Sequence, residues 1–188
     1  MASLVLNGNT SGSVTISSPA VSGTTTLTLP TQSGTVLTSA SNTNFPTGSV
    51  LQVVNATYAT QTSSTSTTYV DTGLSATITP SSTSSKILVI VQQTGCGKDT
   101  NDTTLQLQLL RGATALFKFE AVGAWIGAGG RNFIGTCGTS YLDSPATASA
   151  VTYKTQQASY NGGANTYTQF NVGTGSSTST ITLLEIAG

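Results

Sequence analysis

Residues 104–110 read TLQLQLL, a stretch in which leucines alternate with glutamines. Neighbouring side chains of a β-strand point to opposite faces, so this alternation predicts a strand with one apolar face and one polar face. The stretch LSATIT at 74–79 alternates in the same way, with Leu74, Ala76 and Ile78 on one face. No window of helical length carries an apolar stripe at the helical period, so the sequence predicts an all-β protein.

Further short runs of β-branched, apolar and aromatic residues are separated by Gly, Ser, Asn and Pro, as in strands joined by turns. They are VLQVV at 50–54, TTYV at 67–70, KILVIVQ at 86–92, ALFKF at 115–119, NFIGT at 132–136, AVTYKTQ at 150–156, YTQFNV at 167–172 and TITLLEI at 180–186. Such spacing predicts an antiparallel β-sandwich or jelly roll. The run 86–92 is apolar on both faces, which predicts a central strand or a subunit contact. The run 181–186 predicts an oligomer interface for the same reason.

The N-terminal part of the chain is a short repeat. Residues 11–43 read SGSVTISSPAV, SGTTTLTLPTQ and SGTVLTSASNT, so that Ser-Gly returns every eleven residues. Each unit offers a short strand, and its glycine accepts the positive φ of a turn. The first two units also carry a proline, Pro19 and Pro30, which stops further strand pairing. Chains below about 40 residues usually need a partner to fold. We therefore predict an extended attachment arm at 1–43, a linker at 44–49 and a globular β-sandwich domain at 50–188.

Apolar side chains of the arm are the predicted attachment or oligomer interface. They are Leu4, Leu6, Val14, Ile16, Leu27 and Leu29. The alternative, a disordered Ser/Thr-rich linker, would leave these side chains in water.

Charge is scarce: the 188 residues include 6 Lys and Arg and 6 Asp and Glu, and none precedes Asp71. So little basic charge argues against a nucleic-acid partner. The chain start lacks the pattern of a signal peptide, and no stretch has the length and apolarity of a membrane span, so we expect synthesis in a cytoplasm. In that compartment Cys96 and Cys137 are predicted to be two buried thiols rather than a disulfide.

Catalytic and metal-binding signals are missing from the sequence. It contains no histidine, and its carboxylates, Asp71, Asp99, Asp102, Glu120, Asp143 and Glu185, form no paired motif. Histidine is the commonest general base and metal ligand, so we predict no enzyme activity, no metal and no cofactor. The six acids are interpreted as solvated loop residues and turn formers.

Aromatic residues on glycine-rich loops are the candidate receptor contacts. Trp125, the single tryptophan, lies in GAWIGAGG, and Tyr160 and Tyr167 flank the turn Asn161-Gly162-Gly163. Loops at the end of a sandwich often carry binding, and an aromatic side chain on such a loop can stack on a sugar, here a host-surface glycan, or anchor a neighbouring subunit. The alternatives are a tryptophan folded back onto the core and a plain surface hairpin.

The opening LVLNGNTSGSVTISSPAVSGTTTLTLP at 4–30 resembles the N-terminal segments of small structural and fibre proteins of tailed bacteriophages, notably marine ones. The stretches VLQVVNATYATQT, YVDTGLSATITPSSTSSKILV, YLDSPATASAVTYKTQ and STSTITLLEIAG are similar to the β-rich tips that follow such segments. The resemblance implies a homotrimeric virion protein, exposed on the particle surface and anchored to capsid or tail proteins by its N-terminus.

One departure from the family pattern narrows this expectation. Long tail fibres usually begin with a dedicated tail-docking domain, whereas this chain starts directly in the repeat. We therefore expect a short head fibre or capsid decoration. A tail fibre or glycan-recognising receptor-binding tip is the alternative, and a polysaccharide depolymerase is the third hypothesis.

Overall fold

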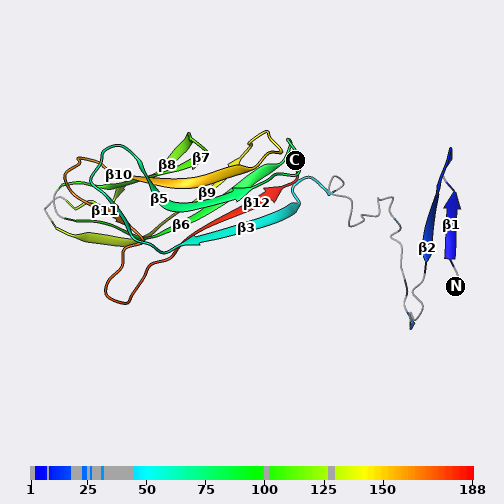
Figure 1. Ribbon diagram of the computed structural model, residues 1–188, viewed down its shortest axis with the longest axis horizontal. Coiled ribbons are helices and arrows are strands. Elements are labelled where there is room, and N and C mark those ends of the chain that lie inside the picture. The colour runs from blue at the N-terminus through cyan, green and yellow to red at the C-terminus, as the bar shows by residue number, and fades with distance from the viewer. Residues whose placement is uncertain are drawn as a thin grey trace. The chain divides into compact units, whose positions relative to one another are not determined.

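The computed structural model describes residues 3–7, 9–17, 23–24, 26, 31, 45–99, 102–126 and 130–188. The chain divides into two compact units, Met1–Val36 and Leu37–Gly188. Every regular element of the described residues is a β-strand (Figure 1). The all-β fold class is therefore confirmed.

The described part of the first unit is a two-stranded antiparallel sheet. It consists of β1 (Ser3–Asn7) and β2 (Ser13–Ser17). Gly12 precedes β2 with a φ of 76°, and Gly23, the glycine of the second Ser-Gly pair, has a φ of 57°. Both lie in the left-handed region, which glycine enters without steric cost, so these two glycines have the positive φ that the repeat predicts.

The second unit contains two antiparallel sheets, which Figure 1 shows as layers. One sheet has the order β5-β10-β7-β8, and the other has the order β3-β12-β6-β11-β4, with β9 paired to β6. The strands are β3 (Val50–Tyr58), β4 (Thr62–Ser64), β5 (Val70–Ile78), β6 (Lys86–Lys98), β7 (Leu105–Arg111), β8 (Thr114–Gly123), β9 (Asn132–Asp143), β10 (Val151–Ser159), β11 (Thr166–Thr168) and β12 (Ser179–Ile186).

The longer strands of this unit are paired in a nested order. Leaving aside the three-residue strands β4 and β11, β3 pairs with β12, β5 with β10, β6 with β9 and β7 with β8. The first strand thus pairs with the last, and the two middle strands form the innermost hairpin. The chain therefore runs as one long hairpin that folds over into two layers.

The apolar core lies between the layers. One sheet contributes Leu74, Ala76, Ile78, Leu109, Val151 and Tyr153, and the other contributes Ile87, Val89, Val91, Ile181 and Leu183. The alternating faces predicted for 74–79 and 104–110 are confirmed, because their apolar members are the buried ones. The position of β6 between β12 and β9 confirms the prediction of a central strand.

Part of the interior between the sheets is polar. Gln93 of β6 donates from Nε2 to the Ser179 hydroxyl at 3.1 Å and accepts the Thr155 hydroxyl hydrogen at Oε1 at 2.8 Å. All three side chains are completely buried. Because Thr155 belongs to β10 and Gln93 to β6, the hydrogen bond between them joins the two sheets. Both bonds satisfy groups that would otherwise be costly to bury.

The predicted strand at 67–70 is absent except for its last residue, Val70, where β5 begins. Serine side chains replace strand pairing here: the Ser64 hydroxyl accepts from Ser66 N at 3.0 Å, and the Ser66 hydroxyl accepts from Thr68 N at 2.9 Å. Such local side-chain bonds favour turns over strand ladders.

The predicted strand at 167–172 also ends early, because β11 stops at Thr168. The next residue, Gln169, has a φ of 50°, a left-handed conformation that interrupts an extended strand. Its buried amide donates from Nε2 to the Ser179 hydroxyl at 2.9 Å, which holds the side chain inside.

The interpretation of all six carboxylates as solvated is wrong for Asp143 and Glu185, which are 6% and 1% exposed. Glu185 Oε2 accepts from Gln52 Nε2 at 2.6 Å, and its Oε1 accepts from Ser81 N at 2.7 Å and Ser81 Oγ at 2.6 Å. Burial alone would raise the pKa of the Glu185 carboxyl. The hydrogen bonds to the ionised form outweigh burial and hold this pKa below its ordinary value.

We expect Glu185→Gln to lower the free energy of unfolding by about 1–3 kcal/mol at neutral pH, because it weakens charge-assisted hydrogen bonds. A pKa lower in the folded chain than in the unfolded chain stabilises the fold above the unfolded-state value of about 4.3. That contribution disappears as the pH falls through the folded-state pKa. Urea denaturation at pH 7 and pH 3 measures the free energy of unfolding of the wild-type and Glu185→Gln chains. The difference between the two chains should be smaller at pH 3 than at pH 7, and an equal difference at both pH values would contradict this role.

Candidate functional site

Trp125 and Tyr160 line one groove of about 550 Å³ on the second unit. Its other principal lining residues are Asp102, Thr104, Gln106, Val122 and Asn161. The start of β7 and the ends of β8 and β10 meet here, because β7 runs antiparallel to both neighbours. Three loops far apart in the sequence are thus brought to one end of a sheet, where binding sites are common.

The segment 102–104, which precedes β7, holds both aromatic loops. Trp125 Nε1 donates to Asp102 Oδ1 at 3.0 Å, and the Tyr160 backbone N donates to the Thr104 carbonyl at 3.1 Å. Asn161 Nδ2 donates to the Asp102 carbonyl, and Asn161 N donates to the Thr103 hydroxyl at 3.2 Å. These bonds fix the Trp125 indole and the backbone at Tyr160 and Asn161.

The turn that presents Trp125 has an unusual backbone. Ala124 has a φ of 59°, in the left-handed region that non-glycine residues seldom occupy, and it is buried. The Trp125 backbone N donates to the Val122 carbonyl at 3.2 Å, which closes the turn. Strained backbone of this kind clusters at functional sites, where the surrounding structure maintains it.

The groove carries apolar surface next to unused polar groups. Trp125, Tyr160 and Val122 are 58%, 61% and 69% exposed. Among the described residues, Asp102 Oδ2 and the Tyr160 hydroxyl have no hydrogen-bond partner, and both groups belong to the groove lining. Exposed aromatic faces beside unpaired polar atoms are the composition of a ligand site rather than of a core.

Tyr167 lies apart from this groove and is 8% exposed. Its ring centroid is 5.1 Å from that of Phe170 and 6.0 Å from that of Phe133, and its hydroxyl donates to Asp99 Oδ2 at 3.2 Å. Burial and the Asp99 carboxylate raise the Tyr167 pKa above its ordinary value. The segment between Tyr160 and Tyr167 connects the two sheets, because β10 and β11 belong to different ones, and so it is not a plain hairpin.

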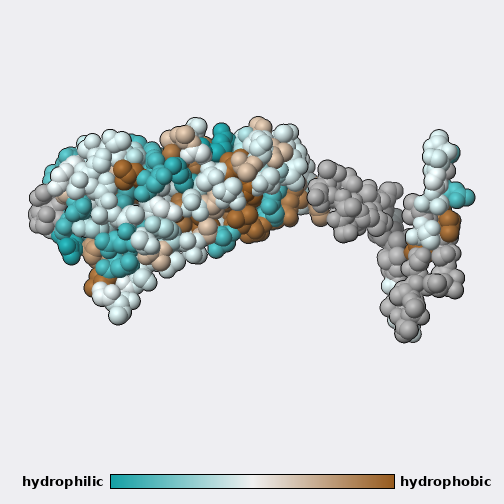
Figure 2. All heavy atoms as spheres, in the orientation of Figure 1, coloured by the Kyte–Doolittle hydropathy of each residue, from teal (hydrophilic) through white to brown (hydrophobic). Residues whose placement is uncertain are grey.

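The outer face of the β3-β12-β6-β9 layer carries a row of apolar residues. Val53 pairs with Leu184, Leu184 with Leu88, and Leu88 with Leu142, so that the row crosses four strands, or about 14 Å. Val53 and Leu142 are 58% and 50% exposed. Figure 2 shows hydrophobic residues gathered over β3 and β12. We call this row the outer-face row.

The arm residues are exposed wherever the structure describes their side chains. Leu6 and Ile16 are 53% and 51% exposed, and Val5 is 50% exposed. The β1–β2 register sets Leu6 opposite Val14 and Ile16 opposite Leu4. The predicted contacts Leu27 and Leu29 lie outside the described residues.

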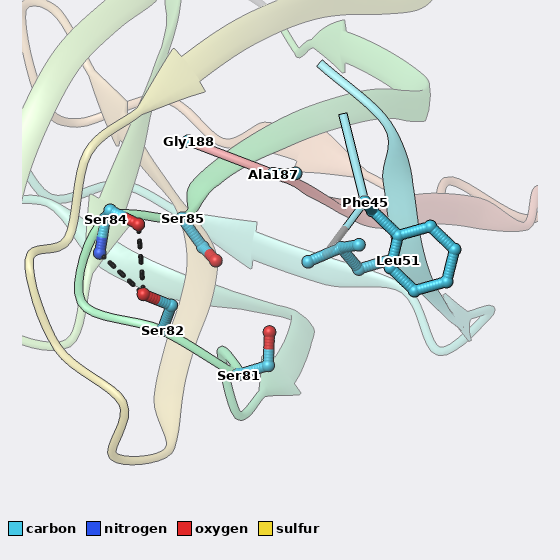
Figure 3. Close-up of a pocket in the computed structure, with 8 residues that line it drawn as sticks. All are labelled: Phe45, Leu51, Ser81, Ser82, Ser84, Ser85, Ala187 and Gly188. Carbon is cyan, nitrogen blue, oxygen red and sulfur yellow. Dashed lines mark hydrogen bonds between the residues drawn. The ribbon is translucent and has the colours of Figure 1, made fainter. Parts of the chain in front are cut away.

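A smaller hollow of about 90 Å³ lies near the C-terminal residues (Figure 3). Serines of the 81–85 segment lie on one side, with the Ser82 hydroxyl bonded to Ser84, and Phe45 and Leu51 lie on the other. Its volume suits a few water molecules, so it is a poor candidate for a larger ligand.

The two cysteines are free, buried thiols, as predicted. The hydrogen bond between them and their burial raise the pKa of Cys96 above its ordinary value. Because the thiolate is the reactive form, this raised pKa lowers the reactivity of Cys96.

Comparison with known protein families and with curated proteins gives no match for this chain. Within the described residues no three His, Cys, Asp or Glu side chains gather as a metal site would require. The described part of the chain also has no helix that is long and apolar enough to cross a bilayer.

Proposed function

We propose that this protein is a virion structural protein, a short trimeric head fibre or capsid decoration anchored by its N-terminal repeat arm. In this proposal the second unit is a jelly roll that faces outward from the particle. The nested strand pairing supports that fold, because eight strands in two sheets are the jelly-roll arrangement found in capsid and lectin domains.

The observation that carries the proposal is the exposure of the arm. The described hairpin of β1 and β2 leaves Val5, Leu6 and Ile16 about half exposed. A two-stranded hairpin is at best marginally stable in water, and this one has no charged side chain to favour solvation. An apolar, uncharged hairpin of this kind gains stability by lying against another protein, which in our proposal is the capsid and the neighbouring arms.

The outer-face row supports self-association of the second unit. Its four members, Val53, Leu184, Leu88 and Leu142, are all apolar. The next row on the same face is mostly polar, because Ile90 lies beside Thr182 and Ser140, and Thr182 lies beside Asn55. Interfaces are distinguished by an apolar centre depleted of charge. The four residues of the outer-face row carry no charge, so two copies of the row can meet without electrostatic repulsion, which favours a homo-oligomer.

Deleting residues 1–43 is expected to abolish incorporation into particles while leaving the thermal unfolding midpoint of the β-domain unchanged. Particles assembled with full-length or truncated chain can be compared by immunogold electron microscopy and immunoblotting of purified virions. The pair Leu6→Ser and Ile16→Ser should weaken incorporation, whereas the matched surface change Thr15→Ser should not. Full incorporation of the truncated chain would contradict the anchoring role, and gold labels on tails rather than heads would favour the tail-fibre alternative.

A further inference from the structure

We propose that the groove lined by Trp125 and Tyr160 is a binding site for a neutral saccharide. This inference needs only the folded second unit and does not depend on where the protein is located. It places a recognition function at one end of the β-sheets, away from the apolar row that we assign to self-association.

The two exposed aromatic side chains supply the apolar part of the site. A pyranose ring presents a face of C–H groups, which stacks on the flat face of an indole or phenol. Trp125 and Tyr160 are each more than half exposed, although side chains of this size gain considerable free energy by burial. Their exposure in one groove is explained if a ligand covers them.

The polar groups of the groove match the hydroxyls of a sugar. Asp102 Oδ1 accepts from the indole, and its Oδ2 has no partner among the described residues. Gln106 Oε1 accepts from the Tyr69 hydroxyl at 3.2 Å, which leaves its amide hydrogens for a ligand. The Asp102 carboxylate can accept a hydrogen bond from one sugar hydroxyl while the Gln106 amide donates to an adjacent one.

The charge of the groove selects against anionic and purely apolar ligands. Asp102 is the one charged residue among the described residues of the groove lining, so an anionic ligand such as a phosphate, a nucleic acid or a sialylated glycan would be repelled. A purely apolar ligand would leave the Asp102 carboxylate desolvated without a partner, which is costly. The groove volume of about 550 Å³ lies in the range of small-molecule sites and accommodates one or two sugar rings.

The site is preorganised, which lowers the entropy lost on binding. The 102–104 segment fixes Trp125 through the indole N–H and fixes Tyr160 through its backbone N–H. Thr104 Oγ1 also donates to the Ala121 carbonyl at 3.0 Å, which ties the end of β8 to the same segment.

Trp125 is the single tryptophan of the chain, so its fluorescence reports on this groove alone. We would titrate the full-length protein with maltohexaose, a β-glucan hexamer and chitohexaose, with sialyllactose as the acidic comparison and hexylamine as a cationic one. A saturable change in emission is expected with at least one neutral hexamer and not with sialyllactose. Silence with every neutral saccharide, or a response to sialyllactose or hexylamine alone, would overturn the assignment.

Variants separate the groove from the rest of the domain. Tyr160→Ala should weaken the neutral saccharide by at least about tenfold in a fluorescence titration, and Trp125→Ala should do so in calorimetry. Phe45→Ala is the matched control, because Phe45 is also an exposed aromatic, at 42%, but lies outside the groove. Circular dichroism melting curves verify that each variant is folded. Equal affinity of the Tyr160→Ala and Phe45→Ala chains would show that the saccharide binds elsewhere.

Discussion

Replacing Asp143 with alanine is expected to lower the free energy of unfolding by about 3 kcal/mol, because it leaves an arginine and a buried tyrosine without their shared acceptor. Asp143 is the last residue of β9 and is 6% exposed. Arg111 Nη1 lies 3.0 Å from Asp143 Oδ1 and 2.9 Å from Oδ2, and the Tyr153 hydroxyl donates to Oδ2 at 2.6 Å.

The size of this effect follows from where the three residues lie. Arg111 ends β7 and Tyr153 belongs to β10, so both come from the sheet opposite β9. Burial and the Asp143 carboxylate raise the pKa of Tyr153 above its ordinary value, so its hydroxyl remains a donor. The Arg111 side chain is 32% exposed and regains some hydration in the variant, which places the expected loss at the lower end for a broken buried pair.

Urea denaturation followed by circular dichroism measures this loss, and two further variants calibrate it. Tyr153→Phe removes one hydrogen bond and should cost about 1 kcal/mol. Asp71→Ala removes the exposed pair with Lys154 and should cost no more than about 1 kcal/mol. If the Asp143 and Asp71 variants lose the same stability, the carboxylate does not join the sheets as described.

The strands were predictable where apolar and polar residues alternate along the sequence. Leu74, Ala76 and Ile78 face the core as the sequence pattern indicates, because the alternation of a strand is a local property. The run 86–92 was expected to be a central strand or a subunit contact, and it forms a central strand between β12 and β9. The missing strand at 67–69 and the end of β11 at Thr168 were not predictable from propensity, because they depend on side-chain hydrogen bonds of Ser66 and Gln169. The bond of Gln169 is to a residue ten positions away.

Buried polar residues were the main error of the sequence interpretation. Gln93, Thr155 and Ser179 are typical surface residues, and nothing local shows that the fold places them between the sheets. The burial of Asp143 and Glu185 was not predictable for the same reason, because their partners Arg111 and Gln52 are distant in sequence. Pairing between distant polar groups is set by topology, which one sequence does not reveal.

The candidate groove was predictable in part. Glycine-rich loops pointed to Trp125 and Tyr160, and the structure places both in one groove. The sequence also grouped Tyr167 with Tyr160 because both flank the same turn, yet Tyr167 packs into a separate aromatic cluster. Asp102 had no distinguishing signal, because its contact with Trp125 spans 23 positions and depends on how the β7 and β8 strands pair.

Changing Val53 and Leu142 together to aspartate is expected to convert the proposed trimer to a monomer at micromolar concentration. Both side chains are at least half exposed in the single chain, so the double variant should fold with little loss of stability. In an interface that covers the outer-face row, each new carboxylate would be buried without a partner, at a cost of several kcal/mol. Each 1.4 kcal/mol weakens association tenfold, so two such charges are sufficient to dissociate a micromolar assembly.

Size-exclusion chromatography with light scattering, together with native mass spectrometry, distinguishes the two states. Val172→Asp is the matched control, because Val172 is 73% exposed and lies outside the outer-face row, so this variant should keep the wild-type mass. A wild-type chain that is monomeric would reject the trimer itself. A double variant that remains trimeric would show that the subunits do not meet through the outer-face row. The arm would then be the candidate interface, because its described apolar side chains are also exposed.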